Sequence, residues 1–194
     1  MMQRLVALTI CAALVLASGC ASTPPSRFYT LSAVTVLAAA PSNVSVAVGP
    51  VSVPADVDRP QFVVSTGPNQ VALDEFNRWA SPLQNGISRV VAENLVMMLG
   101  TPRVTLYPQT LSADADYRAA IEVQSFASAP GEAAMLDTVW TVRRMKDGKT
   151  QTGRTTVREP VREKGFDALA AAHSRAVARL SQDIAGAVRA LARS

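Results

Sequence analysis

The sequence predicts a single α+β domain in which two long helices pack on one face of a mostly antiparallel sheet. Seven or eight short runs have the alternating, β-branched character of strands. Two long segments, in the middle and at the end of the chain, have the apolar periodicity of amphipathic helices. An Asp147-Gly148 step between two strand-like runs is a strong hairpin signal.

The N-terminal segment has the anatomy of a secretory signal. Residues 1–4 carry one positive charge, and residues 5–16 form an apolar run that is too short to span a bilayer. Small residues then lead to Cys20, which makes the segment resemble a bacterial lipoprotein signal. We therefore predict a signal peptide over residues 1–19 and lipid attachment at Cys20. The alternative is an ordinary cleaved signal in which the cysteine stands by chance.

Acylation of Cys20 would fix the chain to a membrane. Each buried methylene contributes about 0.8 kcal/mol, so two or more acyl chains anchor a protein stably. Residues 20–26 are small, polar and rich in proline, which is typical of an extended tether. At about 3.3 Å per residue the tether could lift the domain, predicted over residues 27–194, roughly 20 Å from the lipid.

Composition restricts what the mature chain can do. Removing 19 of the 194 residues leaves 175, enough for one domain with a sizeable core. The second cysteine, Cys11, lies in the signal, so the mature chain has no pair of thiols for a disulfide. The formal charge falls from +4 to +3 with the loss of Arg4, which gives no reason to expect nucleic-acid binding.

The first half of the mature chain is predicted to be mostly strands. We expect strands over residues 27–31, 44–53 with a break at Gly49-Pro50, 61–65 and 70–73. A further short strand over residues 76–79 is the weakest of these predictions. Residues 66–69, Thr-Gly-Pro-Asn, are typical of the turn of a hairpin. Residues 33–43 show no clean period and are expected to be mostly loop.

The central helix has start and stop signals. Ser81 is the expected cap, Pro82 the first helical residue, and Gln84 completes a capping box. Gly100 and Pro102 are expected to end the helix. The apolar face between them comprises Ile87, Val90, Val91, Leu95, Met98 and Leu99.

The second half is predicted to contain further strands and the final helix. Strands are expected over residues 104–107, 117–126, 134–144 and 150–158. A helix over residues 167–190 follows, with an alanine-rich stripe that allows close approach to its neighbour. The stripe consists of Leu169, Ala172, Ala176, Leu180, Ile184, Ala187, Val188 and Leu191.

We find no constellation that predicts catalysis, a metal or a cofactor. The chain has one histidine, His173, at the edge of the last apolar stripe, where a packed or half-exposed side chain is the expected role. Ser174 forms no dyad with it, because adjacent helical positions point in different directions. No glycine-rich phosphate-binding motif is present. We therefore predict a protein that is not an enzyme.

A run of basic residues extends over residues 143–164. Its members are Arg143, Arg144, Lys146, Lys149, Arg154, Arg158, Arg162 and Lys164. Three acidic residues, Asp147, Glu159 and Glu163, are interleaved with them. We favour a solvated hairpin and loop; the alternative is a face for anionic lipid headgroups or an acidic partner.

An ordered series of motifs resembles the PqiC-like (YmbA-like) ABC-transport auxiliary lipoproteins. The motifs are Arg27-Phe28-Tyr29-Thr30-Leu31, Val51-Ser52-Val53-Pro54, Asp58-Arg59-Pro60-Gln61, Gly67-Pro68-Asn69, Glu75-Phe76-Asn77-Arg78-Trp79-Ala80, Pro82-Leu83, Arg89-Val90-Val91-Ala92-Glu93-Asn94-Leu95 and residues 172–181. The resemblance covers essentially the whole mature chain and is weakest over residues 127–164, so it gives no role to the basic hairpin.

The resemblance implies a role in the cell envelope. Members of this family are expected in the outer membrane, with the domain in the periplasm, where they work with a periplasmic MCE-domain protein and an inner-membrane component. Together these move lipids between membranes or maintain envelope integrity. The resemblance also implies a ring-like homo-oligomer and no enzymatic activity. Ala21 after Cys20 fits release to the outer membrane in bacteria that sort lipoproteins in the enterobacterial way.

Four residues form the predicted protein interface: Arg59, Pro60, Arg78 and Trp79. Arginine and tryptophan are frequent anchors of protein interfaces. Prolines make the loop rigid before it binds a partner, which lowers the entropy lost on binding. The alternative is that Trp79 belongs to the core and Arg59 braces the loop. Two other functions also remain open, a lipoprotein that regulates a cell-wall enzyme and an envelope hydrolase.

Overall fold

A computed structural model describes residues 23–34 and 39–194. The predicted signal peptide and Cys20 lie outside the described residues. The elements in chain order are β1 (Arg27–Tyr29), β2 (Val46–Ser52), β3 (Gln61–Gly67), β4 (Gln70–Trp79), α2 (Leu83–Leu99), β5 (Val104–Leu106), the 3-10 helix η1 (Thr110–Ser112), β6 (Tyr117–Ala129), β7 (Ala133–Arg144), β8 (Thr150–Pro160) and α3 (Phe166–Arg193). The predicted α+β class is confirmed.

The strands form one eight-stranded mixed sheet with β6 at its centre. One edge of β6 pairs with β7, which pairs with β8, and both long pairings are antiparallel. Two groups of short strands pair with the other edge of β6. The strands β2 and β5 lie beside residues 117–122, and β3, β4 and β1 lie beside Ser128. The pairings of β6 with β2 and β3, of β2 with β5 and of β1 with β4 are parallel, and each of them is short.

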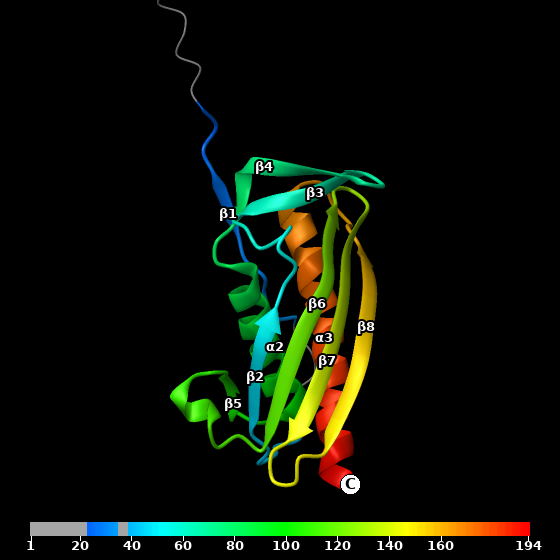
Figure 1. Cartoon of the computed structure of the whole chain (residues 1–194). Coiled ribbons are helices and arrows are strands. Elements are labelled where there is room, and N and C mark those ends of the chain that lie inside the picture. The colour runs from blue at the N-terminus through cyan, green and yellow to red at the C-terminus, as the bar shows by residue number, and fades with distance from the viewer. Residues whose placement is uncertain (1–22, 35–38) are drawn as a thin grey trace, which may run out of the picture.

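Both helices cover the same face of the sheet, as predicted. Figure 1 shows α2 and α3 behind β2, β6 and β7, with the β3–β4 hairpin lying across the end where the N-terminal segment enters. α3 contacts β7 and β8, and α2 contacts β2 and α3. None of the helices in the described part is long and apolar enough to cross a bilayer.

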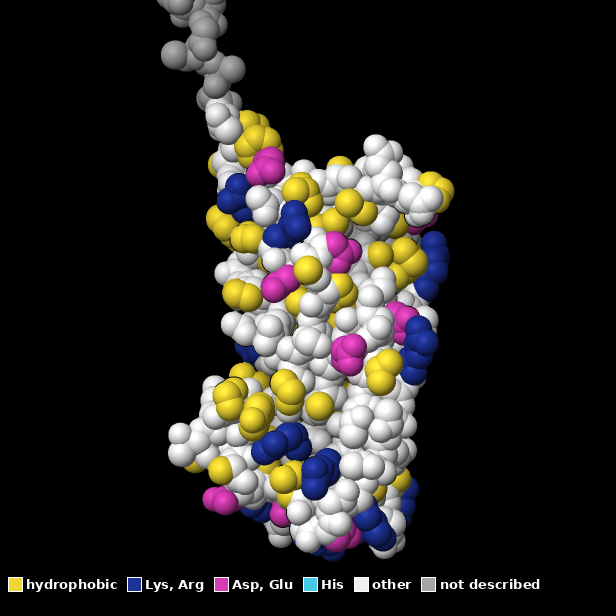
Figure 2. All heavy atoms as spheres, viewed as in Figure 1, with side chains coloured by type: hydrophobic (Ala, Val, Ile, Leu, Met, Phe, Trp, Pro, Cys, Tyr) yellow, Lys and Arg dark blue, Asp and Glu magenta, His cyan; other side chains and the backbone are white. Residues whose placement is uncertain are grey.

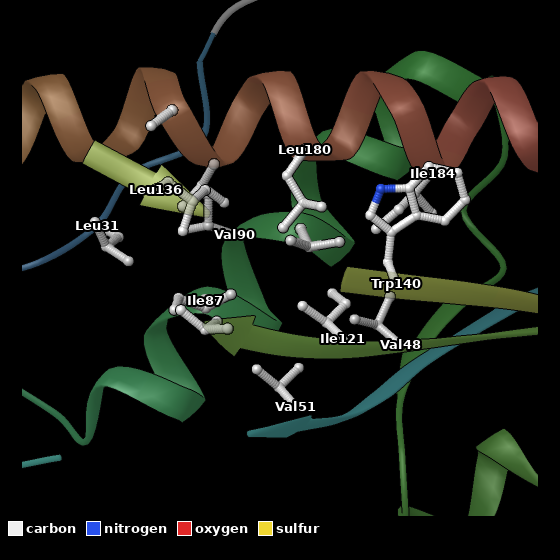
Figure 3. Close-up of a cluster of buried hydrophobic side chains, with 14 of the residues drawn as sticks. Leu31, Val48, Val51, Ile87, Val90, Ile121, Leu136, Trp140, Leu180 and Ile184 are labelled. Carbon is white, nitrogen blue, oxygen red and sulfur yellow. The ribbon is translucent and has the colours of Figure 1, made fainter. Parts of the chain in front are cut away.

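The main core fills the space between the two helices and the sheet. Leu180 and Ile184 of α3, Val90 of α2 and Ile121 of β6 are among its buried members and are drawn in Figure 3. The alternation predicted over residues 117–126 buries Tyr117, Ala119, Ile121 and Val123, because successive residues of a strand point to opposite faces. At Ser125, also expected inside, it fails: a bulge shifts the register after Val123, so that Ser125 is exposed and Phe126 is buried. Gly153 of β8 gives Trp140 room, since a Cβ there would lie 2.3 Å from the indole ring.

The start of α2 corrects the predicted capping box. The helix begins at Leu83, the cap position is Pro82, and no side chain caps the first turn. The Pro82 carbonyl accepts the Gly86 N–H at 3.1 Å, which is the first helical bond and defines the cap residue. Ser81 and Gln84 therefore do not form a capping box. The predicted stop is confirmed, because Gly100 adopts a left-handed conformation at the C-terminus.

The strand predicted over residues 76–79 is not separate. It is the end of the ten-residue strand β4. The register with β3 shifts between Gln61 and Phe62, so residues 75–77 form a bulge in β4. The Asp74 carboxylate accepts the backbone N–H groups of Phe76 and Asn77 at 3.0 and 2.7 Å and holds the bulge.

Candidate functional site

The predicted interface residues meet at the end of the domain where β3, β4 and the start of α2 come together. The Trp79 N–H donates to the Pro60 carbonyl at 2.7 Å, which joins the end of β4 to the loop before β3. That loop is a tight turn, because the N–H groups of Val57 and Asp58 both donate to the Pro54 carbonyl. The resulting surface pocket is lined by Asp58, Arg59, Pro60, Trp79, Ala80, Ser81 and Pro82.

Trp79 itself belongs mainly to the core. Its side chain is 7% exposed and stacks on Phe62 with ring centroids 4.1 Å apart. Phe126 meets it edge-on at 6.0 Å. The core placement that the sequence left open for Trp79 is therefore observed, and only its edge lines the pocket.

The other three residues lie at or near the surface. Arg59 and Pro60 are exposed, and Arg78 is partly buried. The Arg78 Nε donates to the Glu75 carbonyl at 2.8 Å, and one Nη lies 3.5 Å from the Glu75 carboxylate. Arg78 is therefore held against its own strand. These residues can offer a planar cation and a rigid proline to a protein partner.

The segment that follows the tether is fastened to this same end. β1 runs parallel to the end of β4, and the Ala80 N–H donates to the Tyr29 carbonyl at 2.9 Å. The Tyr29 hydroxyl donates to Asn77 at 2.8 Å. The next apolar side chain, Leu31, is buried in the core. The chain that would carry the acylated cysteine thus enters the domain at β1 in a fixed position.

Polar groups of both helices complete this attachment. Arg89 of α2 donates to the Leu31 carbonyl at 2.6 Å. The Ser32 N–H donates to the Ser174 hydroxyl of α3 at 3.1 Å, and the Val34 N–H donates to Asn94 at 3.2 Å. These three contacts, which we call the clamp on residues 31–34, were not predicted from the sequence. Its only sequence signals were Asn94 and Ser174, polar residues among the apolar positions of two helices.

His173 is a packed residue. It is fully buried on α3, and its Nε2 lies 2.8 Å from the Ser128 hydroxyl. Within the described residues its Nδ1 has no hydrogen-bond partner. Burial lowers the pKa of the imidazole to about 3, so it is neutral at physiological pH. A neutral, enclosed ring among aromatic side chains stabilises the fold and is not presented to a substrate.

The basic run does not form one continuous face. Arg144 is buried, with its Nε and Nη2 bonded to the Asp147 carboxylate at 3.0 and 2.6 Å. Arg154 pairs with Asp137 across β7 and β8. Arg143 is exposed near the β7–β8 turn. The turn itself lies at the end of the domain opposite the point where the N-terminal segment enters (Figure 1).

Metal chemistry has no support in the described part of the chain. Over residues 23–34 and 39–194, no group of three or more His, Cys, Asp or Glu residues could hold a metal ion. The pocket beside Trp79 is lined by one cation, one carboxylate, two prolines, a serine, an alanine and the edge of the tryptophan.

A family model described as the ABC-type transport auxiliary lipoprotein component matches residues 29–185, and the chain belongs to this family. The predicted family is confirmed. A comparison with curated proteins finds no significant match.

Two solved structures share the fold. One, described only as an uncharacterized protein, is 21% identical, with a TM-score of 0.70, and the match covers 85% of this chain and 99% of the other. The second is a Xanthomonas campestris protein of the DUF330 family, 18% identical, with a TM-score of 0.67. That match covers 87% of this chain and 100% of the other. At these identities the likeness supports the fold.

Proposed function

We propose that this protein is an outer-membrane auxiliary lipoprotein of an MCE-type intermembrane lipid transport system. Acylated Cys20 would hold it in the membrane, and the domain would lie in the periplasm. There it would bind the MCE-domain protein, which works with an inner-membrane component, and so support envelope integrity. The observation that carries this proposal is the match of the transport auxiliary family to residues 29–185.

We further propose that Arg59, Pro60 and Arg78 form part of the surface that binds the MCE-domain protein or a second copy of this chain in a ring. Arg59 and Pro60 are exposed beside the pocket, and the turn between Pro54 and Arg59 is held by its own backbone hydrogen bonds. A preorganised loop loses little conformational entropy on docking. In this proposal the buried Trp79 supports the surface through the core and contributes one edge.

The first experiment asks where the protein is anchored. The wild type and Cys20→Ala are fractionated from cells that are fed a palmitate analogue. We expect label and outer-membrane localisation only for the wild type. An unlabelled wild type, together with a Cys20→Ala variant that still pellets with the outer membrane, would contradict the lipid anchor.

The second experiment asks what the protein binds. Arg59→Glu is compared with Arg143→Glu, which changes the same exposed residue type at the far end of β7. We expect Arg59→Glu to reduce capture of the cognate MCE-domain protein, or the assembly mass measured by light scattering, with unchanged thermal melting. Trp79→Ala should lower the melting temperature. Equal capture by both arginine variants would reject the surface, and co-purification with a peptidoglycan synthase instead would favour the cell-wall alternative.

A further inference from the structure

Large apolar side chains are exposed at the end of the domain where the tether enters. Phe28 of β1 is 64% exposed, and three residues of β4, Val71, Leu73 and Phe76, are 58%, 42% and 37% exposed. Water-exposed apolar side chains grouped in one place indicate a contact surface more often than isolated ones do. Figure 2 shows apolar side chains close to the point where the N-terminal segment joins the domain.

The strand register places most of these side chains on one face. Paired residues of neighbouring strands point to the same side of a sheet, and successive residues point to opposite sides. Leu73 pairs with Val63, and Val71 pairs with Ser65, whereas Phe62 points the other way into the aromatic core.

The same argument adds β1 to this face. Phe28 pairs with Arg78, which also pairs with Gln61, the residue before Phe62. Phe28 therefore points away from the core, as its exposure indicates. Phe76 lies in the bulge between the two paired stretches of β4. We call Phe28, Val71, Leu73 and Phe76 the apical patch.

The tether brings the apical patch close to the membrane that holds Cys20. Cys20 and Arg27 are seven positions apart in the sequence, which corresponds to roughly 20 Å when fully extended. The point where the tether joins the domain is fixed, because Leu31, Ser32 and Val34 are bound to both helices. In Figure 1 the β3–β4 hairpin forms the end of the molecule from which the tether leaves.

We propose that the apical patch rests on the lipid surface to which Cys20 is attached. The inference depends on the lipid attachment at Cys20 that is part of the proposed function. The patch adds buried apolar area to the acyl anchor, and the two together hold the domain in one orientation. The exposed charges on β1, on β4 and in the turn before β3 have both signs, among them Arg27 and Glu75 on the strands and Asp58 and Arg59 in the turn. Apolar contact and not headgroup charge would therefore dominate.

The proposal also assigns a direction to the opposite end. The strands β7 and β8 run from the hairpin region to the turn at residues 145–149, so the basic side chains of Arg143, Lys146 and Lys149 lie away from the anchoring membrane (Figure 1). Twelve residues of strand at about 3.3 Å each span about 40 Å. These cations would face the periplasm, where they are available to a protein partner.

The test uses a fluorescent label at a single thiol. Cys11 and Cys20 are the only cysteines in the sequence, so a mature, acylated protein has no other free thiol. Leu73→Cys and the control Met145→Cys change apolar side chains of similar exposure, 42% and 40%. Each acylated variant is labelled with an environment-sensitive fluorophore and reconstituted in phosphatidylethanolamine–phosphatidylglycerol vesicles, with and without brominated acyl chains.

We expect brominated lipid to quench the label at residue 73 severalfold more than the label at residue 145, with a blue-shifted emission at residue 73 alone. Equal, weak quenching at both positions overturns the proposal. Protection of residue 73 from aqueous iodide without quenching by brominated lipid, together with cross-linking between copies, assigns the patch to an interface between two chains and also overturns it. Vesicle flotation tests the lipid anchor at Cys20 separately from the lipid contact of the apical patch. Protein that does not float with the vesicles lacks the anchor, and the proposed function then fails.

Discussion

The rings of Phe126 and His173 lie face to face, with centroids 3.9 Å apart and planes 8° from parallel. Phe126 comes from β6 and His173 from α3, so this stack joins the central strand to the final helix. The Ser128 hydroxyl, two residues along β6, holds the imidazole from its edge. The only histidine of the chain is therefore a structural link between the sheet and α3.

This link should make the fold sensitive to acid. Burial lowers the pKa of His173 to about 3, whereas an unfolded histidine titrates near 6.5. Below pH 6.5 the unfolded chain binds a proton at His173 that the folded chain does not bind, so the free energy of unfolding falls as the pH decreases. The full contribution is present above about pH 6.5, and roughly 2 kcal/mol should be lost between pH 6.5 and 4.5.

Chemical denaturation of the wild type and of the double variant His173→Phe/Ser128→Ala tests this expectation. The second change removes the hydroxyl that would otherwise lose its partner. Stability of the double variant should be nearly flat over the same pH window. An equally steep loss in both proteins would mean that other groups cause the acid sensitivity.

Two glycines should respond in opposite directions to the same substitution. Gly153→Ala forces a methyl group against Trp140 and should destabilise the domain by about 1–3 kcal/mol through overpacking. At Gly186 in α3 a Cβ would meet no atom within 4 Å, so Gly186→Ala should stabilise by up to about 1 kcal/mol. Thermal melting of the two variants measures both effects. A loss at Gly186 as large as that at Gly153 would contradict the stated packing.

The central helix offers a matched pair of truncations. Leu95 is fully buried and Met97 is exposed, although both belong to α2. Leu95→Ala should cost about 2–5 kcal/mol, and Met97→Ala should cost far less. Ser81→Ala should have little effect, because Ser81 caps nothing in the structure. Denaturant titration measures the free energy of unfolding of each variant. A loss of about 1 kcal/mol in Ser81→Ala would support the cap predicted from the sequence and contradict the structure.

The local parts of the fold were predictable. The 117–126 strand, the 134–144/150–158 hairpin and the two helices depend on periods of two and 3.6 residues and on Asp147-Gly148, which are visible within short windows. The parallel pairings of β1, β2 and β5 were not predicted, because they join residues far apart in sequence. Ser81 was predicted wrongly because Pro82 adopts an extended conformation and takes the cap position itself.

The candidate site was predictable to a similar degree. The family motifs led us to group Arg59, Pro60, Arg78 and Trp79. In the structure the hydrogen bond from the Trp79 N–H to the Pro60 carbonyl joins the two segments at one end of the domain. The burial of Trp79 depends on Phe62 and Phe126 from two other strands, which no local pattern reveals. The apical patch was hidden for the same reason, since the face on which Phe28 lies follows from the pairing of its strand with the distant strand β4.

The turn between β7 and β8 should also depend on pH. Hydrogen bonds from Arg144 lower the pKa of the Asp147 carboxyl to about 2. Because its pKa is lowered, this carboxylate stabilises the fold fully at a pH above its ordinary pKa of 3.8. The stabilisation is lost as the pH falls through about 2. Asp147→Asn should therefore melt at a lower temperature than the wild type at pH 7. The difference should shrink below pH 4, and a difference independent of pH would show that charge is not its cause.

The attachment of the N-terminal segment predicts a local effect on dynamics. Arg89 donates one Nη to the Leu31 carbonyl and the other to Glu93, at 2.6 and 2.7 Å. Arg89→Ala removes both bonds, whereas Glu93→Gln removes only the exposed ion pair, which is expected to contribute about 0–1 kcal/mol. Because the backbone of Ser32 and Val34 is held beside this bond, their amides should exchange hydrogen faster in Arg89→Ala while the sheet remains protected. Native-state hydrogen exchange measures this directly. Glu93→Gln should behave like the wild type, and faster exchange in both variants would assign the effect to the helix surface and not to the clamp on residues 31–34.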